Sequence, residues 1–304
     1  MRKVAIIGSN GFIGRHLTER LMKEQDLALS LFGKSDSGSV NNDLPYHRID
    51  FFNKAELEKN FAGMEVVYYL ASETIPATSW ENPSLEIEKN LIPFINFLQV
   101  AATTGVRKVV FVSSAGTIYG TTNDLVTEDA NKNPFSPYGI TKLTMENYLR
   151  YYRVKYGMQY DIFRVSNVYG EGQNTAKGLG IVNTFLEKII RDKEVKIFGD
   201  GNTVRNYIYV KDVAELLSRS LNNLQSSETY NVSSNNTLSI NDLVKIIKTV
   251  VAEEFKVVYT DVRQSDNSAV FLDNSRILKA HPDFKFSPIE EGIARTYTFI
   301  KASK

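Results

Sequence analysis

Three glycines between a short apolar run and a helical pattern place the strongest constraint on the fold of this chain. Gly8, Gly11 and Gly14 are spaced G-x-x-G-x-x-G, directly after apolar residues 3–7 and at the start of a helical pattern over residues 11–23. Such glycines permit a tight turn, a close approach of the backbone to a pyrophosphate, and close helix–strand packing. The helix N-terminus adds N–H donors and partial positive charge. A dinucleotide-binding loop is therefore predicted, formed by Gly8, Asn10, Gly11, Phe12, Ile13 and Gly14.

Apolar runs alternate with helical patterns along the first 165 residues. The strongest runs lack polar alternation, so we expect strands that are buried on both faces and covered by helices. This pattern is typical of a doubly wound parallel sheet. Strands are predicted at residues 3–7, 28–32, 46–50, 66–70, 108–113 and 160–164. Helices are predicted at residues 11–23, 54–61, 85–104 and 137–156, with a long loop through Pro76 and Pro83.

The pattern becomes less regular after about residue 166. Helices are expected at residues 181–190 and 212–221, the second with Asp212 as its N-cap, and strands at 195–198 and 207–210. The prediction is an α/β protein: a Rossmann-like, doubly wound parallel sheet with a smaller mixed α/β C-terminal domain that binds substrate. The dinucleotide-binding domain would comprise residues 1–165 with a return segment of about 206–232. The cap would comprise residues 166–205 and 233–304.

Composition excludes several classes of function. The 36 basic and 35 acidic residues give a net charge of +1, which supports neither nucleic acid nor a membrane surface as partner. There is no Cys, and the three His (His16, His47 and His281) lack metal-ligand spacing, so we expect no metal site. Acid–base chemistry must then come from Tyr, Lys, Asp, Glu or a cofactor. No secretory or membrane-spanning segment is visible, so a cytoplasmic protein is expected.

The residue that reads the cofactor ribose is expected at the end of the second strand. An Asp or Glu there accepts hydrogen bonds from the ribose hydroxyls and favours NAD. This chain instead has Gly33, followed by Lys34 and Ser35. These two side chains could receive a 2′-phosphate, which favours NADP; alternatively, Lys34 is a solvated surface residue.

Tyr138 and Lys142 are a candidate acid–base pair. They are four residues apart in a predicted helix, so their side chains share one face. A nearby ammonium stabilises a phenolate and lowers the pKa of the tyrosine toward working pH. Two other pairs with this spacing are expected on the surface: Tyr151 with Lys155, and Tyr207 with Lys211.

Together these motifs resemble the extended short-chain dehydrogenase/reductase superfamily. Within it, the chain is similar to the NAD-dependent epimerase/dehydratase family, and especially to its UDP-glucose 4-epimerase-like members. The resemblance runs in order along nearly the whole chain. It comprises GSNGFIG at 8–14, YLAS at 69–72, FVSSAGTIYG at 111–120, PYGITK at 137–142, RVSNVYGEGQ at 164–173 and GDGNTVRNYIYVKDV at 199–213.

The resemblance implies roles for particular residues. Asp50 would contact the adenine and Phe51 would flank it. Tyr138 and Lys142 would be the acid–base pair, and Lys142 would also hold the nicotinamide ribose. Further cofactor contacts would come from Leu70, Ala71, Ser72 and Asn90. The sugar-nucleotide diphosphate would be approached by Asn167 and clamped by Arg205 and Arg263, since a guanidinium fork suits phosphate.

The chain departs from the family pattern at several positions. Ala115 stands where the usual Ser or Thr partner of the catalytic tyrosine belongs; Thr117 would place a hydroxyl nearby if the strand continues, because residues two apart face the same way. Gly33 replaces the usual acid, and Asn206 stands where Asp is common. Gly116 and Thr117 occupy the positions where 4,6-dehydratases usually carry an Asp–Glu pair, which disfavours that reaction.

The leading functional hypothesis is reversible 4-epimerisation of a nucleotide sugar. Tightly bound NAD or NADP would take hydride from C4 while Tyr138 takes the hydroxyl proton, and hydride would return to the other face of the 4-keto intermediate. An NADP-dependent 4-ketoreductase of a dTDP- or GDP-linked 6-deoxy sugar is the alternative, favoured by Lys34 and Ser35. A non-catalytic dinucleotide sensor, favoured by Ala115, is a third possibility.

The family resemblance also implies a homodimer. Its members often pack the helices that begin near Asn90 and Pro137 into a four-helix bundle. The residues that would form this face, or would pack on the sheet instead, are Met145, Tyr148, Leu149 and Tyr152.

Overall fold

The computed structural model describes residues 1–36, 43–122, 124–177, 180–261 and 270–303. The chain divides into two compact units. Unit 1 comprises Met1–Gly120, Lys132–Arg164 and Ala214–Tyr230; unit 2 comprises Thr121–Asn131, Val165–Val213 and Asn231–Lys304. The segment that returns to unit 1 is thus shorter than the predicted 206–232, and Thr121–Asn131 belongs to unit 2 rather than to the dinucleotide-binding part.

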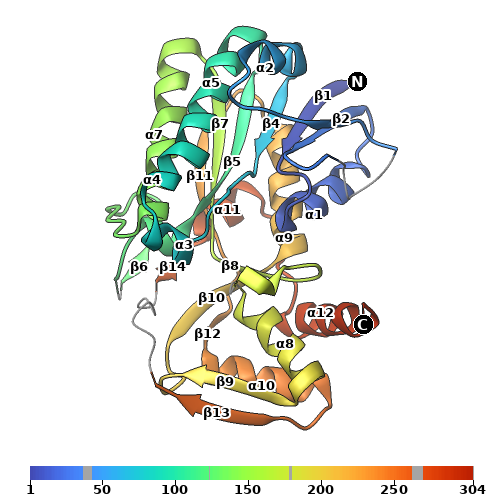
Figure 1. Ribbon diagram of the computed structural model, residues 1–304, viewed down its shortest axis with the longest axis vertical. Helices are drawn as coiled ribbons and strands as arrows, with labels where there is room; N and C mark the ends of the chain where they lie inside the picture. The colour runs from blue at the N-terminus through green and yellow to red at the C-terminus, as the bar shows by residue number, and fades with distance from the viewer. Residues whose placement is uncertain (37–42, 123, 178–179, 262–269, 304) are drawn as a thin grey trace. The chain divides into compact units, whose positions relative to one another are not determined.

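Unit 1 is built on a seven-stranded sheet in the order β11-β7-β5-β4-β1-β2-β3 (Figure 1). Strands β3, β2, β1, β4 and β5 are paired in parallel. The chain order reverses at β1, which lies between β2 and β4, so this is the Rossmann-like, doubly wound arrangement that the sequence predicted. The strands are β1 (Arg2–Ile7), β2 (Leu27–Gly33), β3 (Tyr46–Arg48), β4 (Val66–Tyr69), β5 (Lys108–Ser114), β7 (Gln159–Val165) and β11 (Glu228–Val232).

Helices cover both faces of this sheet (Figure 1). One face carries α2 (Lys54–Phe61), α5 (Ile92–Thr104) and α7 (Pro137–Tyr156), and the other carries α1 (Phe12–Leu21) and α9 (Val210–Ser218). Under the first three helices lies a continuous apolar cluster rich in aromatic rings: Phe32, Phe51, Phe61, Tyr69, Phe94, Phe97 and Phe111. Burial of each such ring stabilises the fold by roughly 1.5–3 kcal/mol. The strands between two such layers are apolar on both faces, as expected.

The side chains considered for a helical bundle belong mainly to this core. Met145, Leu149 and Tyr152 are buried in the cluster, and Tyr148 packs against it while partly exposed. They point toward the sheet because α7 keeps them on its inner face at helical spacing. Of the two interpretations given for these residues, packing on the sheet holds for Met145, Leu149 and Tyr152, whereas Tyr148 stays partly exposed.

Two segments have a helical structure that differs from the prediction. Residues 85–104 are not one α-helix: α4 (Ser84–Glu86) leads into a π-helical turn, η1 (Ile87–Leu91), before α5 begins. Pro93 cannot donate a backbone hydrogen bond, and the amide of Ile92 bonds back to Ile87, which widens this turn. The expected loop after residue 72 contains a short helix, α3 (Pro76–Glu81), with its proline at a permitted first position.

The strand through the sequence FVSSAGTIYG ends earlier than the prediction for Thr117 requires. β5 ends at Ser114, and Ala115–Ile118 form the short helix α6.

The prediction that Asp212 is an N-cap is also wrong. It is the third residue of α9, and its carboxylate accepts hydrogen bonds from the backbone N–H of Ser287, at 2.9 Å, and from its hydroxyl, at 2.7 Å.

Unit 2 contains short strands and amphipathic helices (Figure 1). A three-stranded sheet has the order β12 (Thr237–Ser239), β10 (Val204–Tyr209), β8 (Asn167–Tyr169). Two smaller pairs are β9 (Glu194–Phe198) with β13 (Lys256–Thr260), and β6 (Leu125–Val126) with β14 (Phe271–Leu272). The helices are α8 (Ile181–Asp192), α10 (Ile240–Val251), α11 (Ser275–Ala280) and α12 (Ile289–Ala302). Short 3₁₀ turns lie at Thr175–Lys177 in unit 2 and at Arg219–Asn222 in unit 1.

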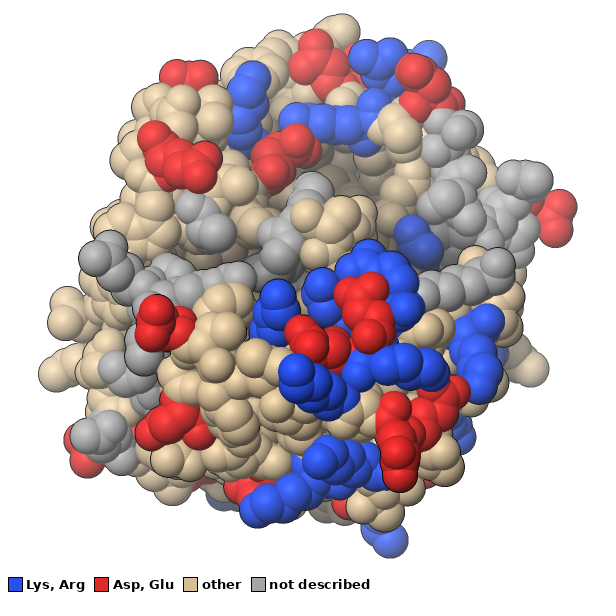
Figure 2. All heavy atoms as spheres, turned by 60° about the horizontal axis from the view of Figure 1, so that its bottom comes forward, with Lys and Arg blue, Asp and Glu red and all other residues tan. Residues whose placement is uncertain are grey.

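Charge is mixed on the surface. Figure 2 shows basic and acidic side chains interspersed on the face that it displays, in keeping with the net charge of +1. Among the helices that the structure describes, none is both long enough and apolar enough to cross a membrane.

Candidate active site

The glycine loop joins β1 to α1 in the geometry that its sequence predicts. Gly8 has φ +87°, and its N–H donates to the carbonyl of Phe32 at 2.8 Å. A Cβ at Gly8 would lie 2.9 Å from the Ala71 nitrogen, and one at Gly14 would overlap the Gly8 carbonyl oxygen. Helix α1 begins without a side-chain cap or an acidic residue in its first turn. Its N-terminal N–H groups are thus available to an anion, and this chemistry fits a pyrophosphate.

We expect Gly14→Ala to weaken NAD⁺ binding about 100-fold, because the added methyl group must displace the Gly8 carbonyl from the loop. Gly116→Ala is the matched control, since a Cβ at Gly116 meets nothing within 4 Å. Isothermal titration calorimetry checks both variants. A Gly14→Ala protein that binds within threefold of wild type would contradict the assignment of the loop.

The segment after β4 connects the glycine loop with the acid–base pair. The N–H of Leu70 donates to the carbonyl of Ile7 at 2.9 Å, and Ala71 packs against Gly8. Ser72, whose hydroxyl donates to the Thr74 carbonyl at 3.1 Å, lies close to Tyr138. The structure therefore places the predicted residues Leu70, Ala71 and Ser72 between the two parts of the site.

Asn90 holds this segment from the side. Its Oδ1 accepts from the N–H of Glu73 at 2.9 Å, and its Nδ2 donates to the Thr74 hydroxyl at 2.8 Å and to Glu86 Oε2 at 3.1 Å. Asn90 was predicted to contact the cofactor. Because its amide already makes these three bonds, we infer that it supports the site by fixing the loop after β4.

The residues at the end of β2 have partners within the chain. Lys34 forms an ion pair with Glu73 at 3.0 Å. The Ser35 hydroxyl accepts from Asn10 Nδ2 at 2.6 Å and lies 2.9 Å from the Tyr46 hydroxyl. A Cβ at residue 33 would lie 2.6 Å from that same hydroxyl, so Tyr46 occupies the space that an acidic side chain would need. This packing explains Gly33.

Asp50 and Phe51 follow β3 in different environments. Asp50 is exposed, and its Oδ1 accepts from the N–H of Phe52 at 2.9 Å. The Phe51 ring is buried against Tyr69, with centroids 6.0 Å apart. Phe51 was predicted to flank the adenine. Because its ring packs in the core, only its backbone or the edge of its ring could do so.

Tyr138 and Lys142 share one face of α7, as predicted. Ser136 caps this helix by accepting from the N–H of Gly139 at 3.1 Å, and Pro137 takes its first position. Lys142 is 6 % exposed, lies 5.6 Å from the centroid of the Tyr138 ring, and donates to the carbonyl of Val112 at 3.1 Å. The phenol of Tyr138, which is half-buried, thus lies beside the buried ammonium of Lys142.

Burial dominates the acidity of both groups. It lowers the pKa of Lys142 to about 8, although the carboxylates of Glu86 and Glu146 oppose the change. Burial and the charge of Glu86 raise the pKa of Tyr138 above its usual value, and the nearby Ser72 side chain only partly offsets this. The expected lowering of the Tyr138 pKa by Lys142 is therefore not found in the protein alone. A positive charge brought close to the phenol would lower its pKa.

Thr117 lies beside the start of α7 for a different reason from the one predicted. Its carbonyl oxygen packs so closely on Gly139 that a Cβ there would overlap it. Its hydroxyl is 3.5 Å from the carbonyl of Ser114 in the turn of α6, and the side chain is half-buried. Ala115 is fully buried and offers no hydroxyl. Thr117 is thus near Tyr138 through helix packing, not through a continued strand.

The two other Tyr–Lys pairs lie elsewhere. Tyr151 and Lys155 are on the exposed face of α7, with the ammonium 5.5 Å from the ring centroid. The surface prediction is wrong for Tyr207, whose ring is buried on β10, while Lys211 pairs with Glu171 at 2.9 Å. Burial follows from the position of Tyr207 on a central strand.

The predicted substrate residues in unit 2 lie on neighbouring strands. Asn167 on β8 is exposed, and its Nδ2 donates to the carbonyl of Asn206 on β10 at 2.9 Å; Arg205 is the preceding residue of β10. Arg263 lies outside the described residues. The amide of Asn206 donates to the Thr237 hydroxyl at 2.6 Å and accepts from the N–H of Leu272 at 3.3 Å. An Asp could accept from both groups, because the Thr237 hydroxyl can also donate, so nothing in the structure explains why Asn stands here.

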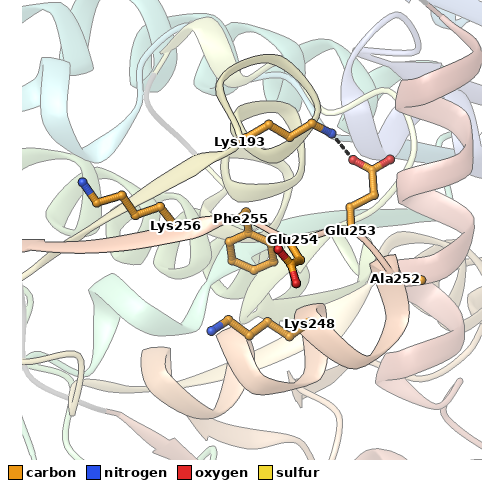
Figure 3. A pocket seen from close by; sticks show the side chains of 7 residues that line it. All are labelled: Lys193, Lys248, Ala252, Glu253, Glu254, Phe255 and Lys256. Atoms are coloured by element: carbon orange, nitrogen blue, oxygen red, sulfur yellow. Dashed lines mark hydrogen bonds and ion pairs between the residues drawn. The ribbon is translucent and has the colours of Figure 1, made fainter.

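A surface depression of about 690 Å³ also lies in unit 2 (Figure 3). Its lining residues are Lys193, Lys248, Ala252, Glu253, Glu254, Phe255 and Lys256. Glu253 is already bound by Lys193, Tyr297 and Lys301. None of the predicted site residues lines this depression, so we assign no role to it.

The fold and the glycine loop together define a dinucleotide-binding α/β protein, in which Tyr138 and Lys142 are the candidate acid–base pair. Residues 4–233 match the model of the NAD dependent epimerase/dehydratase family. The chain is 30% identical over 312 residues to a UDP-glucose 4-epimerase of Mycolicibacterium smegmatis, with 98% of each chain covered. It therefore belongs to the NAD-dependent epimerase/dehydratase family.

Two solved structures share the fold over the full chain. One is a UDP-N-acetylglucosamine 4-epimerase from Methanobrevibacter ruminantium in complex with UDP-N-acetylmuramic acid: TM-score 0.92, 27% identity, covering 100% of this chain and 99% of that one. The other is a UDP-glucose 4-epimerase of Thermus thermophilus in complex with NAD: TM-score 0.90, 28% identity, covering 99% and 100%.

Glu86 is the site residue that sequence reasoning missed. It lies one helical turn before Asn90, is buried, and acts electrostatically on both Tyr138 and Lys142. Its spacing of four residues from Asn90 would have placed both on one helix face, so the signal was present in the sequence.

Proposed function

We propose that this protein is an NAD-dependent nucleotide-sugar 4-epimerase. The observation that carries the proposal is the continuity of the site within unit 1. Ala71 touches Gly8 of the phosphate loop, and its neighbour Ser72 lies close to Tyr138 of the acid–base pair. The family match and the 4-epimerases of similar fold support this assignment.

The residues of the chain perform the following steps in this proposal. The N-terminus of α1 binds the cofactor pyrophosphate, and Lys142 binds the nicotinamide ribose. Bound NAD⁺ supplies a reversible hydride acceptor. Tyr138 accepts the proton of the sugar 4-hydroxyl as hydride leaves C4, and returns it when hydride is delivered to the opposite face. Thr117 supplies the second hydroxyl beside Tyr138, in place of the residue missing at Ala115.

The substrate is a nucleotide-diphosphate sugar. Asn167 and Arg205 hold its diphosphate, joined by Arg263, while the sugar turns between the two hydride transfers. Binding energy from the diphosphate, which is remote from the reacting carbon, thus positions that carbon.

The cofactor is NAD rather than NADP. Lys34 is neutralised by Glu73, and Ser35 is bonded to Asn10, so neither side chain is held ready for a 2′-phosphate. We expect calorimetry to show at least roughly tenfold tighter binding of NAD⁺ than of NADP⁺, about 1.4 kcal/mol. Glu73→Gln should narrow this preference by releasing Lys34. Tighter binding of NADP⁺ by the wild type would reverse the assignment and favour a ketoreductase.

Activity is tested with UDP-glucose, UDP-N-acetylglucosamine and related sugars. The expected result is an equilibrium mixture of 4-epimers without net consumption of cofactor, because the hydride is returned. A ketoreductase would instead consume one NADPH per turnover. If no sugar is epimerised while NAD is bound, the proposal fails. Mass spectrometry of co-purifying small molecules would identify the nucleotide and the sugar.

We propose a homodimer that acts in the cytoplasm. Its contact would be the outer faces of α5 and α7, not the buried residues of α7. The exposed apolar side chains on these faces and on η1 are Ile87, Ile92, Ile140, Tyr151 and Val154. Light scattering that gives a monomer mass would exclude the dimer.

A further inference from the structure

A buried carboxylate stands beside the acid–base pair without a role in the mechanism above. Glu86 is 2 % exposed and ends α4, directly before the π-helical turn η1. Both segments pack against α7, which carries Tyr138 and Lys142 (Figure 1). π-Helical turns of this kind are frequent at functional sites.

The hydrogen bonding of Glu86 is incomplete. Oε2 accepts from Asn90 Nδ2 at 3.1 Å, but Oε1 is buried and has no hydrogen-bond partner among the described residues. An unsatisfied buried carboxylate is costly, so its retention calls for a compensating charge. The carboxylate's charge raises the pKa of both Tyr138 and Lys142, so it lies within electrostatic reach of each.

The other charges around this place are already paired. Glu146 on α7 is bound by Arg164, at 2.7 Å, and by Arg150, at 3.2 Å. Glu73 in the loop after β4 pairs with Lys34. Glu86 and Lys142 are therefore the two charges of the site that are not committed to such pairs in the described structure.

Oxidation of a secondary alcohol brings a third charge to this place. The proton leaves the oxygen and the hydride leaves the carbon of one C–O–H unit, so Tyr138 and the nicotinamide must both contact that unit. This reasoning rests on the proposed function, because it takes NAD as the hydride acceptor. Oxidised nicotinamide carries a positive charge, and reduced nicotinamide is neutral.

We propose that Glu86 is the buried counter-charge that stabilises the oxidised cofactor beside Lys142. With Glu86 ionised, Lys142 charged and Tyr138 protonated, the site is neutral before the cofactor binds. A bound positive nicotinamide would be balanced if Tyr138 releases its proton to solvent. Tyr138 would then take the proton of the sugar hydroxyl as the nicotinamide becomes neutral, so the net charge of these groups would stay at zero. Without Glu86 the same states each carry an excess positive charge.

The test compares the dissociation constants of NAD⁺ and NADH for the wild type and Glu86→Gln. Calorimetry at pH 6.5, below the pKa of about 8 of Lys142, keeps that ammonium charged in the wild type. We expect the variant to bind NAD⁺ about tenfold more weakly relative to NADH, since one nearby charge is lost. Glu88→Gln, at an exposed position of the same turn, is the matched control and should leave the ratio unchanged.

Glu86→Asp separates charge from packing. It retains the carboxylate and should keep the ratio of the two dissociation constants close to that of the wild type, even if both affinities fall. Equal weakening of NAD⁺ and NADH in Glu86→Gln would overturn the counter-charge role, as would a loss of the ratio in Glu86→Asp. A wild-type protein that binds neither form would instead refute the proposed function.

Discussion

Replacement of Tyr138 by Phe should lower epimerase turnover about 10³-fold while leaving NAD⁺ affinity within a factor of about three, since general acid–base catalysis contributes roughly 10²–10⁴-fold. The ring remains to pack beside Lys142, 5.6 Å from its ammonium, so only the hydroxyl is removed. Initial rates of epimer formation and calorimetry with NAD⁺ measure the two quantities.

Tyr151→Phe is the matched control for this experiment. Tyr151 lies on the same helix as Tyr138, is followed by Lys155 four residues later, and is exposed. The turnover of the Tyr151→Phe variant should therefore equal that of the wild type. If Tyr138→Phe keeps more than a tenth of wild-type turnover, Tyr138 is not the acid–base group. A protein whose wild-type form has no turnover but binds NAD⁺ would be the non-catalytic sensor.

The sequence was sufficient to predict the structure wherever neighbouring residues determine the backbone conformation. The spacing of Gly8, Gly11 and Gly14 predicted the turn because backbone atoms exclude a side chain at Gly8 and Gly14, and a Cβ at Gly11 would lie only 3.1 Å from the Gly8 carbonyl oxygen. The limits of α7 were predicted correctly because Ser136 and Gly157 define its two ends by capping. Strands β1, β2, β4 and β5 followed from their apolar runs, whereas β11 (Glu228–Val232), which joins the same sheet, was not predicted.

Prediction failed where partners distant in sequence decide the conformation. Thr117 was expected to place its hydroxyl near Tyr138 if the strand continued, but Ala115–Ile118 form a helical turn in which the Thr117 carbonyl packs on Gly139. No residue close to Gly33 in the sequence indicates that the Tyr46 hydroxyl occupies the space that a side chain at position 33 would need. Burial first, and then the charge of Glu86, which lies more than fifty residues away in sequence, raise the pKa of Tyr138, so the spacing to Lys142 alone gave the wrong direction.

A buried ionic network beside α7 was also not predicted, because its members lie far apart in the sequence. Arg164 on β7 donates from Nε to Glu146 Oε1 at 3.0 Å, from Nη2 to Oε2 at 2.7 Å, and from Nη1 to the Tyr119 hydroxyl at 2.7 Å. The Ser113 hydroxyl also donates to Glu146, at 2.8 Å. The network ties β5 and β7 to α7 one turn beyond Lys142, so it fixes the helix that carries both proposed catalytic side chains.

We expect Arg164→Met to lower the free energy of unfolding by about 3–5 kcal/mol, because removal of one partner leaves the fully buried carboxylate of Glu146 poorly compensated. Urea unfolding followed by circular dichroism measures the loss. Lys54→Met is the control: it breaks the exposed Lys54–Glu58 pair, 3.7 Å apart, and should cost less than about 0.5 kcal/mol.

The double variant Glu146→Gln with Arg164→Met distinguishes charge from packing in this network. It removes both buried charges, so it should regain part of the stability lost in Arg164→Met. A loss below about 1 kcal/mol in Arg164→Met would show that Arg150, on the remaining side of Glu146, compensates the carboxylate by itself. In that case the network would not be what holds α7 against the sheet, and the apolar contacts of Met145 and Leu149 would have to suffice.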